Sequence, residues 1–146
     1  MSRRTAAMIT FNGLVVLFLG LLAGLPYGMA LVNGWGDDAA RAWKLAHMEG
    51  VLNGILALAL VGCAPWLALG RTAERVVAWG VVLAAYGNVL GAAIGALSGQ
   101  RGLAPQGPAA NWIVFLCFMF GMWGVLIAVP VAASGAWRRW HGAGEG

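Results

Sequence analysis

Four long apolar stretches constrain the fold of this chain more than any other feature of its sequence. They cover residues 10–32, 45–69, 76–97 and 112–137. Each is long enough to cross the roughly 30 Å hydrocarbon core of a bilayer, which takes about 20 helical residues. Charged residues make up only 10% of the chain, too few to cover the surface of a soluble domain. We therefore predict an all-α membrane protein in which residues 1–146 form a single four-transmembrane-helix bundle.

The basic residues predict the orientation of this bundle. Six are expected at the end that carries both termini, namely Arg3, Arg4, Arg71, Arg75, Arg138 and Arg139. Three are expected at the other end, namely Arg41, Lys44 and Arg101. Because cytoplasmic segments carry the excess of Lys and Arg, we expect both termini in the cytoplasm and the protein in a bacterial inner membrane. Lipid headgroups and topology explain the net charge of +4, so nucleic acid is not an expected partner.

The two loops expected on the outer side have different signals. Asp37 and Asp38 precede an alanine-rich segment, which predicts that the second helix begins before its apolar stretch and outside the membrane. Residues 98–111 are dense in Gly and Pro, which argues against a regular element there. This loop is a candidate lid over an outward-facing site.

His47 and Glu49 are the ionisable residues within the apolar stretches, and such residues are candidates for function. At about 100° per residue, His47, Gly50 and Gly54 share one face of the second helix and leave a flat cavity. Imidazole is a common ligand of haem iron, and a planar macrocycle needs small side chains beside that ligand. Alternatively, the two glycines form a G-xxx-G helix contact and His47 is a structural hydrogen-bonding residue. The spacing leaves both interpretations open.

Two asparagines add polar groups within the membrane. Asn53 lies one turn beyond Glu49 on the same face, so these two residues can act together. Pairing of Glu49 with Lys44 or Arg41 at the headgroup level is the interpretation we favour for the carboxylate. Asn53 and Asn88 are both expected about 12–14 Å below the outer end of their helices. Two amides at one depth predict a shared polar pocket.

Several short motifs carry a resemblance to a known family. Ala46-His47 is followed by Leu52-Asn53-Gly54, and Gly87-Asn88-Val89 leads to Arg101-Gly102-Leu103. Gly107-Pro108 and the apolar last stretch complete the pattern. In these features, and over most of its length, the chain resembles the styrene oxide isomerase family of small four-helix membrane enzymes.

The resemblance implies a homotrimer that binds haem b between neighbouring subunits, with His47 as the axial ligand of the iron and Gly50 and Gly54 beside it. In that family the ferric iron acts as a Lewis acid on a small apolar epoxide, and the asparagine that matches Asn53 helps to hold the substrate. Ring opening and a 1,2-shift, a Meinwald-type rearrangement, give an aldehyde or a ketone, and a dry membrane pocket suppresses diol formation. We add Asn88 and Tyr86 as candidate catalytic residues.

Two positions depart from the family pattern. The active-site tyrosine of the family falls on Ala92, and an acidic residue at the start of its motif falls on Ala84. A hydroxyl can come instead from Tyr86 or from Tyr27, although Tyr86 lies about 120° from Ala92 around the third helix. Part of the apparatus that polarises the substrate is therefore missing from these two positions.

Two other functions remain open at this point. One is a haem-binding membrane electron carrier or gas sensor without isomerase activity, which would explain the loss of the tyrosine. The other is a haem-free small transporter or structural membrane subunit, in which His47, Glu49 and the asparagines hold helices together.

Overall fold

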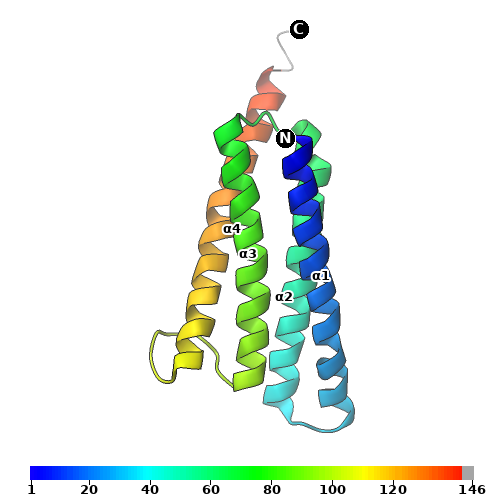
Figure 1. Ribbon diagram of the computed structural model, residues 1–146, viewed down its shortest axis with the longest axis vertical. Helices are drawn as coiled ribbons and strands as arrows, with labels where there is room; N and C mark the ends of the chain where they lie inside the picture. Colours follow the sequence, from blue (N-terminus) through cyan, green and yellow to red (C-terminus); the bar gives the residue numbers. More distant parts are fainter. Residues whose placement is uncertain (143–146) are drawn as a thin grey trace.

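The computed structural model describes residues 1–142 of the chain. Four long helices follow one another as α1 (Arg3–Val32), α2 (Asp37–Cys63), α3 (Arg71–Ser98) and α4 (Ala109–Gly142). A short 3-10 helix, η1 (Ala64–Trp66), continues α2. The long helices run alternately up and down the molecule (Figure 1), and each is long and apolar enough to cross a membrane. The predicted four-helix fold is confirmed, and no strand occurs within residues 1–142.

The helix boundaries differ from the apolar stretches that predicted them. All four helices begin earlier, and α2 begins at Asp37, as the acidic pair predicts. The prediction that the second helix reaches residue 69 is wrong, because α2 ends at Cys63. Pro65 has no backbone N–H and its ring obstructs a further α-helical turn, so the chain passes into η1. The last turns of α4 project beyond the other helices (Figure 1).

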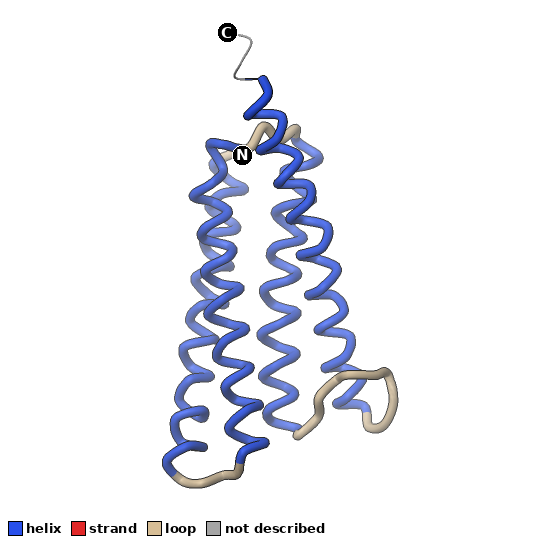
Figure 2. The backbone as a smooth tube through the Cα atoms, turned by 180° about the vertical axis from the view of Figure 1, so that it is seen from behind, coloured by secondary structure: helices blue, strands red, loops and turns tan. Residues whose placement is uncertain are grey.

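The helices pack as two pairs. α1 packs along α2 and α4 packs along α3, as Figures 1 and 2 show from two sides. Contacts of α2 and of α1 with α3 join the pairs. Among residues 1–142, α4 makes no extensive contact with α1 or α2. The surface of α3 between α2 and α4 is therefore more exposed than it would be in a closed four-helix bundle.

Glycines allow the backbones within each pair to approach closely. A Cβ atom on Gly20 of α1 would lie 2.5 Å from the backbone nitrogen of Val51 on α2. In the other pair, a Cβ atom on Gly87 of α3 would lie 2.6 Å from the carbonyl oxygen of Cys117 on α4. Within lipid, where burial of apolar surface does not drive helices together, such close backbone packing supplies much of the association energy.

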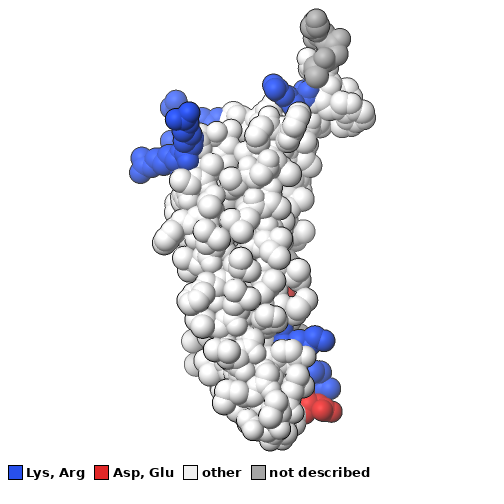
Figure 3. Space-filling model, turned by 90° about the vertical axis from the view of Figure 1, so that its right-hand side faces the viewer, with Lys and Arg blue, Asp and Glu red and all other residues white. Residues whose placement is uncertain are grey.

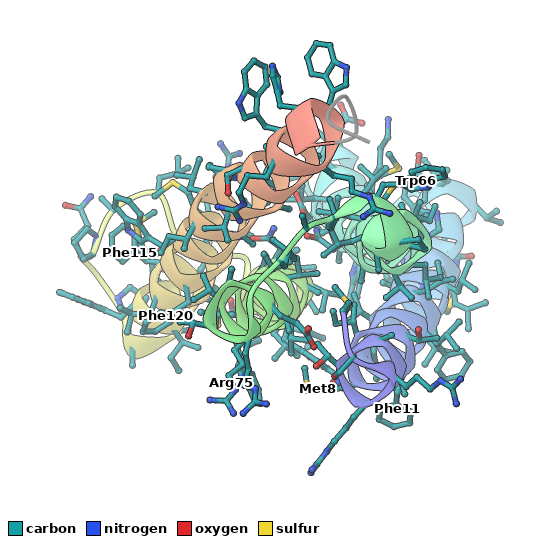
Figure 4. The ribbon with its side chains drawn as sticks, turned by 90° about the horizontal axis from the view of Figure 1, so that it is seen from above. Met8, Phe11, Trp66, Arg75, Phe115 and Phe120 are labelled. Carbon is teal, nitrogen blue, oxygen red and sulfur yellow. The ribbon has the colours of Figure 1, made fainter. Side chains whose placement is uncertain are left out.

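Charge lies at the two ends of the molecule. Figure 3 shows Lys and Arg side chains gathered at both ends, with an almost uncharged surface between them. Seen along the helices in Figure 4, Phe11 of α1 points away from the bundle, and its side chain is 67% exposed. α1 begins and α4 ends at the same end (Figure 1), so the two basic clusters are separated as the sequence predicts. The assignment of that end to the cytoplasm stays a prediction.

Candidate active site

His47 lies on α2 where this helix packs against α1. Its Nδ1 is 2.8 Å from the carbonyl oxygen of Gly20. Because that oxygen can only accept, Nδ1 carries the proton and donates it, which leaves the lone pair on Nε2. A metal-binding histidine commonly makes this second hydrogen bond, which fixes both the tautomer and the ring orientation. The half-buried imidazole is thus oriented by α1 with one nitrogen left for a ligand.

The cavity that the sequence predicts over Gly50 and Gly54 is absent. Both glycines are buried against α1. Gly50 meets the backbone of Gly20, and a Cβ atom on Gly54 would lie 2.7 Å from the Cβ of Leu17. The expected open surface over these glycines is therefore wrong, and the alternative of a close G-xxx-G helix contact is confirmed. The physical reason is that α1 needs the same small residues to reach the α2 backbone.

Two glycines of α1 lie on the His47 side of the helix pair: one makes room for the imidazole and the other faces open space. A Cβ atom on Gly24 would lie 3.0 Å from Nδ1 of the imidazole, so this glycine makes room for the ring. Gly28 is one turn further along α1, and a Cβ atom there would meet nothing within 4 Å. Sequence reasoning missed both residues because it considered small residues only on the helix that carries the histidine. The repeated four-residue spacing from Gly20 to Gly28 was the available signal.

A hollow of about 230 Å³ lies on the same side of the molecule, towards the outer end. Tyr27 of α1 and Lys44 of α2 are among the residues that line it. Lys44 is one helical turn from His47 and makes no ion pair within the part of the chain that the structure describes. A cation and a phenol therefore lie near the imidazole at the edge of the apolar zone.

The second polar group of the bundle is a hydrogen-bonded chain from α2 to α3. Nδ2 of Asn53 is 2.9 Å from Oε2 of Glu49 and 2.8 Å from the Glu49 carbonyl oxygen. Oδ1 of Asn53 accepts a hydrogen bond of 3.3 Å from Nδ2 of Asn88. The structure thus brings Glu49, Asn53 and Asn88 together, as the shared face and the common depth predict. Asn53 is 8% exposed, and Asn88 is half-buried.

Glu49 does not form the ion pair that we favoured from the sequence. No salt bridge joins it to Lys44 or Arg41 within residues 1–142. Arg41 instead contacts Asp38 at 2.7 Å, and Arg101 contacts the same carboxylate at 3.3 Å. The prediction fails because Asp38 is one turn from Arg41 on α2 and better exposed, whereas the Glu49 carboxylate turns inward to Asn53.

A cavity of about 540 Å³ lies between α2, α3 and α4, towards the end of the molecule opposite the two termini. Small residues of α3 line one side of it, among them Gly91, Ala92 and Gly95. Leu45 of α2 and Phe118 of α4 add apolar surface. Gln100, Arg101 and Leu103 of the 98–111 loop border the cavity at the end opposite the termini, where the sequence predicts a covering segment; that this end faces outward stays a prediction. Asn88 does not line the cavity; it lies one turn from Ala92 on the same face of α3, further from the loop.

Tyr86 is not part of this site. Its hydroxyl donates a hydrogen bond of 3.0 Å to Oδ1 of Asn12 on α1. The ring packs with Val16, Ala85 and Val89 on the α1 side of α3. Since Tyr86 lies about 160° from Asn88 around α3, the structure separates this candidate from the amides. A catalytic role for Tyr86 gains no support from its position.

His47 and the amide-lined cavity lie on different sides of α2. Leu45 lines the cavity, and a separation of two residues on a helix places it about 160° from His47. The imidazole faces α1, whereas the cavity faces α3 and α4. Within one chain, a group bound to Nε2 of His47 therefore does not face the amides.

Comparison with models of known protein families identifies the family to which this chain belongs. The family model for styrene oxide isomerase matches residues 5–137, which is most of the chain. This chain belongs to the styrene oxide isomerase family. No curated protein matches it significantly. The resemblance predicted from the sequence motifs is thus confirmed at the level of the family, and an isomerase is the kind of protein its name describes.

Both positions that depart from the family pattern are buried in the structure. Ala92 is 3% exposed and packs with Ala23 and Ala46. Ala84 is 1% exposed and lies beside Gly124 of α4. Ala92 lines the cavity, whereas Ala84 does not.

Proposed function

We propose that this protein is a haem b-dependent membrane isomerase that converts an apolar, styrene oxide-like epoxide to an aldehyde or a ketone. The observation that carries the proposal is the orientation of His47 in a chain of this family. Its Nδ1 is held by the carbonyl oxygen of Gly20, and its Nε2 is left with a lone pair within the apolar part of the bundle. A histidine that only bridges two helices does not need an open surface beside it.

The residues around His47 fit a planar, doubly acidic cofactor. Gly24 accommodates the imidazole ring, and Gly28, one turn further along α1, leaves open surface there. Lys44, in the hollow towards the outer end, offers a cation for a propionate group. Bound to Nε2 of His47, ferric haem would supply a Lewis acid that polarises the epoxide oxygen for ring opening and a 1,2-shift.

The cavity supplies the remaining requirements of the reaction. Its lining inside the membrane is apolar, so a substrate there is shielded from the water that would otherwise give a diol. We place the substrate oxygen beside Asn88, which lies one turn beyond Ala92 of the cavity lining and keeps one N–H without a partner among the described residues. Asn53 does not touch the substrate directly in this arrangement, because both of its N–H groups are bound to Glu49.

A trimer of identical chains would complete the site. His47 and the cavity face different directions on one chain, so the cofactor and the amides meet only if another copy contributes one of them. In a closed ring, head-to-tail contacts place one face of each chain against a different face of the next. We propose that haem held by His47 of one copy borders the cavity of its neighbour.

An electron carrier or gas sensor is the second candidate. The burial of Ala84 and Ala92, which leaves the cavity without the family's tyrosine and acidic side chains, favours it. A haem that is reversibly reduced by a quinol but turns over no epoxide would support this candidate. The close packing of Gly50 and Gly54 agrees with a haem-free structural protein, but that interpretation gives no reason for the open surface at Gly28.

The first experiment is a haem measurement on the protein purified in mild detergent. The absorption spectrum and a pyridine haemochrome assay are compared for the wild type, His47→Ala and the matched control His141→Ala. His141 is exposed and stacks on Trp137 at the end of α4, so its loss should leave a Soret band unchanged. We expect the band to disappear in His47→Ala alone, and wild-type protein to isomerise styrene oxide. A folded, haem-supplemented wild type without haem would refute both haem-dependent candidates.

A further inference from the structure

Glu49 is the one acidic side chain in the membrane part of the bundle that the proposed mechanism leaves unused. It is half-buried, and the structure gives it no cationic partner within residues 1–142. Both of its acceptor groups, the carboxylate and the backbone carbonyl, face Nδ2 of Asn53. An acid in such a place is costly, so its contacts are expected to have a purpose.

The contacts of Glu49 fix the direction of hydrogen bonding along the whole chain of polar groups. A carboxylate and a carbonyl can only accept, so Asn53 must turn its NH₂ group towards Glu49, where both N–H groups find an acceptor. The amide oxygen of Asn53 is then the atom that faces Asn88. Because an oxygen accepts, Asn88 must present its own NH₂ group, at 3.3 Å.

Asn88 is left with one N–H group that has no acceptor among the described residues. An amide NH₂ has two protons, and the structure pairs Nδ2 of Asn88 with Asn53 alone among the described residues. Oδ1 of Asn88 lies against Gly121 of α4, in space that any Cβ atom at this position would occupy. The oxygen is thus kept on the α4 side, away from the partner helix α2. Without the Glu49 carboxylate, the backbone carbonyl of residue 49 would be the one acceptor left for the NH₂ group of Asn53, so the orientation of both amides would be held less firmly.

We infer that Glu49 is a positioning residue, which acts through Asn53 to make Asn88 a hydrogen-bond donor to the substrate oxygen. Negative charge develops on that oxygen as the C–O bond breaks, so a donor stabilises the transition state and an amide oxygen in its place would repel it. The inference rests on the proposed function for the identity of the reaction. The direction of the hydrogen bonds does not depend on it.

The test uses infrared spectroscopy of a bound carbonyl compound and then kinetics. Acetophenone labelled with ¹³C at the carbonyl binds as a stable mimic of the product class, and a hydrogen bond to its oxygen lowers the stretching frequency. The full-length protein is compared with Glu49→Met, which removes the side-chain acceptor, and Glu49→Gln, which keeps an acceptor oxygen. Asn12→Leu is the matched control, because it breaks the other buried amide contact, that with Tyr86.

The expected result is a lowered carbonyl frequency in the wild type, Glu49→Gln and Asn12→Leu, and in Glu49→Met a frequency shifted towards that in apolar solvent, because only the backbone carbonyl of residue 49 still orients Asn53. With styrene oxide, kcat should fall about tenfold in Glu49→Met with little change in KM, less than the hundredfold or more typical for loss of a direct donor. Asn88→Leu should abolish the infrared shift, which keeps the test informative if Glu49→Met fails to fold.

Three outcomes would overturn the inference. The first is a carbonyl frequency that is not lowered in the wild type, and the second is a carbonyl frequency that does not change in Glu49→Met. The third is a folded Glu49→Gln variant that behaves like Glu49→Met. A wild type that lowers the carbonyl frequency but turns over no epoxide refutes the proposed function, while the direction of the hydrogen bonds stands. The two failures are therefore distinguishable.

Discussion

The two sides of α2 present their polar residues in different ways. On the side of α1, His47 makes one hydrogen bond from Nδ1 to a backbone carbonyl, and its Nε2 has no hydrogen-bond partner among the described residues. On the side of α3, Glu49, Asn53 and Asn88 bond to one another in a chain that ends one helical turn from Ala92 of the cavity lining. The proposed function assigns the first side to a ligand atom and the second to a hydrogen-bond donor. The comparison teaches that these two groups face different directions on one chain, so the proposed site needs a second copy.

The largest expected effect comes from mixing two inactive chains. His47→Ala and Asn88→Leu each remove one half, so each variant alone should be nearly inactive on styrene oxide. In every trimer that contains both variants, about one interface in three combines an intact His47 with an intact neighbouring Asn88. We expect turnover to return to roughly that fraction of the wild-type rate, measured on complexes purified through two different tags. No recovery in stable mixed complexes would contradict a site shared between copies.

A second test separates the packed glycines from the open ones on the histidine side. In Gly50→Ala the added methyl group meets the backbone of Gly20, so overpacking should destabilise the protein by about 1–3 kcal/mol. Gly28→Ala is the matched control, because its methyl group meets nothing within 4 Å. Thermal unfolding in detergent should show a lower Tm for Gly50→Ala alone. Equal Tm values for the two variants would show that the close contact of α1 with α2 is wrong.

A third test concerns the size of the cavity on the amide side. Ala92→Leu adds volume to the lining, opposite Phe118 and Leu45. It should lower kcat/KM for epoxides with substituents larger than phenyl by about tenfold relative to styrene oxide, since steric fit in an apolar pocket is worth about 1–3 kcal/mol. The ratio of the two substrates serves as the internal control for folding and haem content. A ratio that stays at the wild-type value would remove this cavity from the substrate path.

The smallest effect is expected at the outer end of the cavity. The carboxylate of Asp38 contacts Arg41 and Arg101, and all three side chains are largely exposed. Asp38→Asn should therefore change the free energy of unfolding by less than about 1 kcal/mol, and the change should shrink at high ionic strength. Unfolding curves at low and high salt measure it. A large, salt-independent loss would mean that this contact is buried in the assembled protein.

Much of the candidate site followed from residue positions along single helices. The common depth of Asn53 and Asn88, and the one-turn spacing of Glu49 and Asn53, predict contacts that the structure contains. The loop at residues 98–111 borders the cavity, as its position next to the third helix suggests. The functional roles assigned to His47, Asn53 and Asn88 stay predictions. The reasoning failed where a residue's partner lay on another helix, as with the cavity over Gly50 and Gly54, the ion pair of Glu49 and the position of Tyr86.

The sequence by itself determined the architecture, because length, hydropathy and the scarcity of charge leave few alternatives to four membrane-spanning helices. It also determined the family, through motifs that lie within single helices and their adjoining loops. Only the tertiary structure decided which glycines pack against a neighbouring helix and which face open space. That choice depends on the rotation of α1 against α2, which many small residues allow and which periodicity within one helix does not specify. The direction of the Glu49–Asn53–Asn88 chain was decided in the same way, since it required α2 and α3 to meet at a particular register.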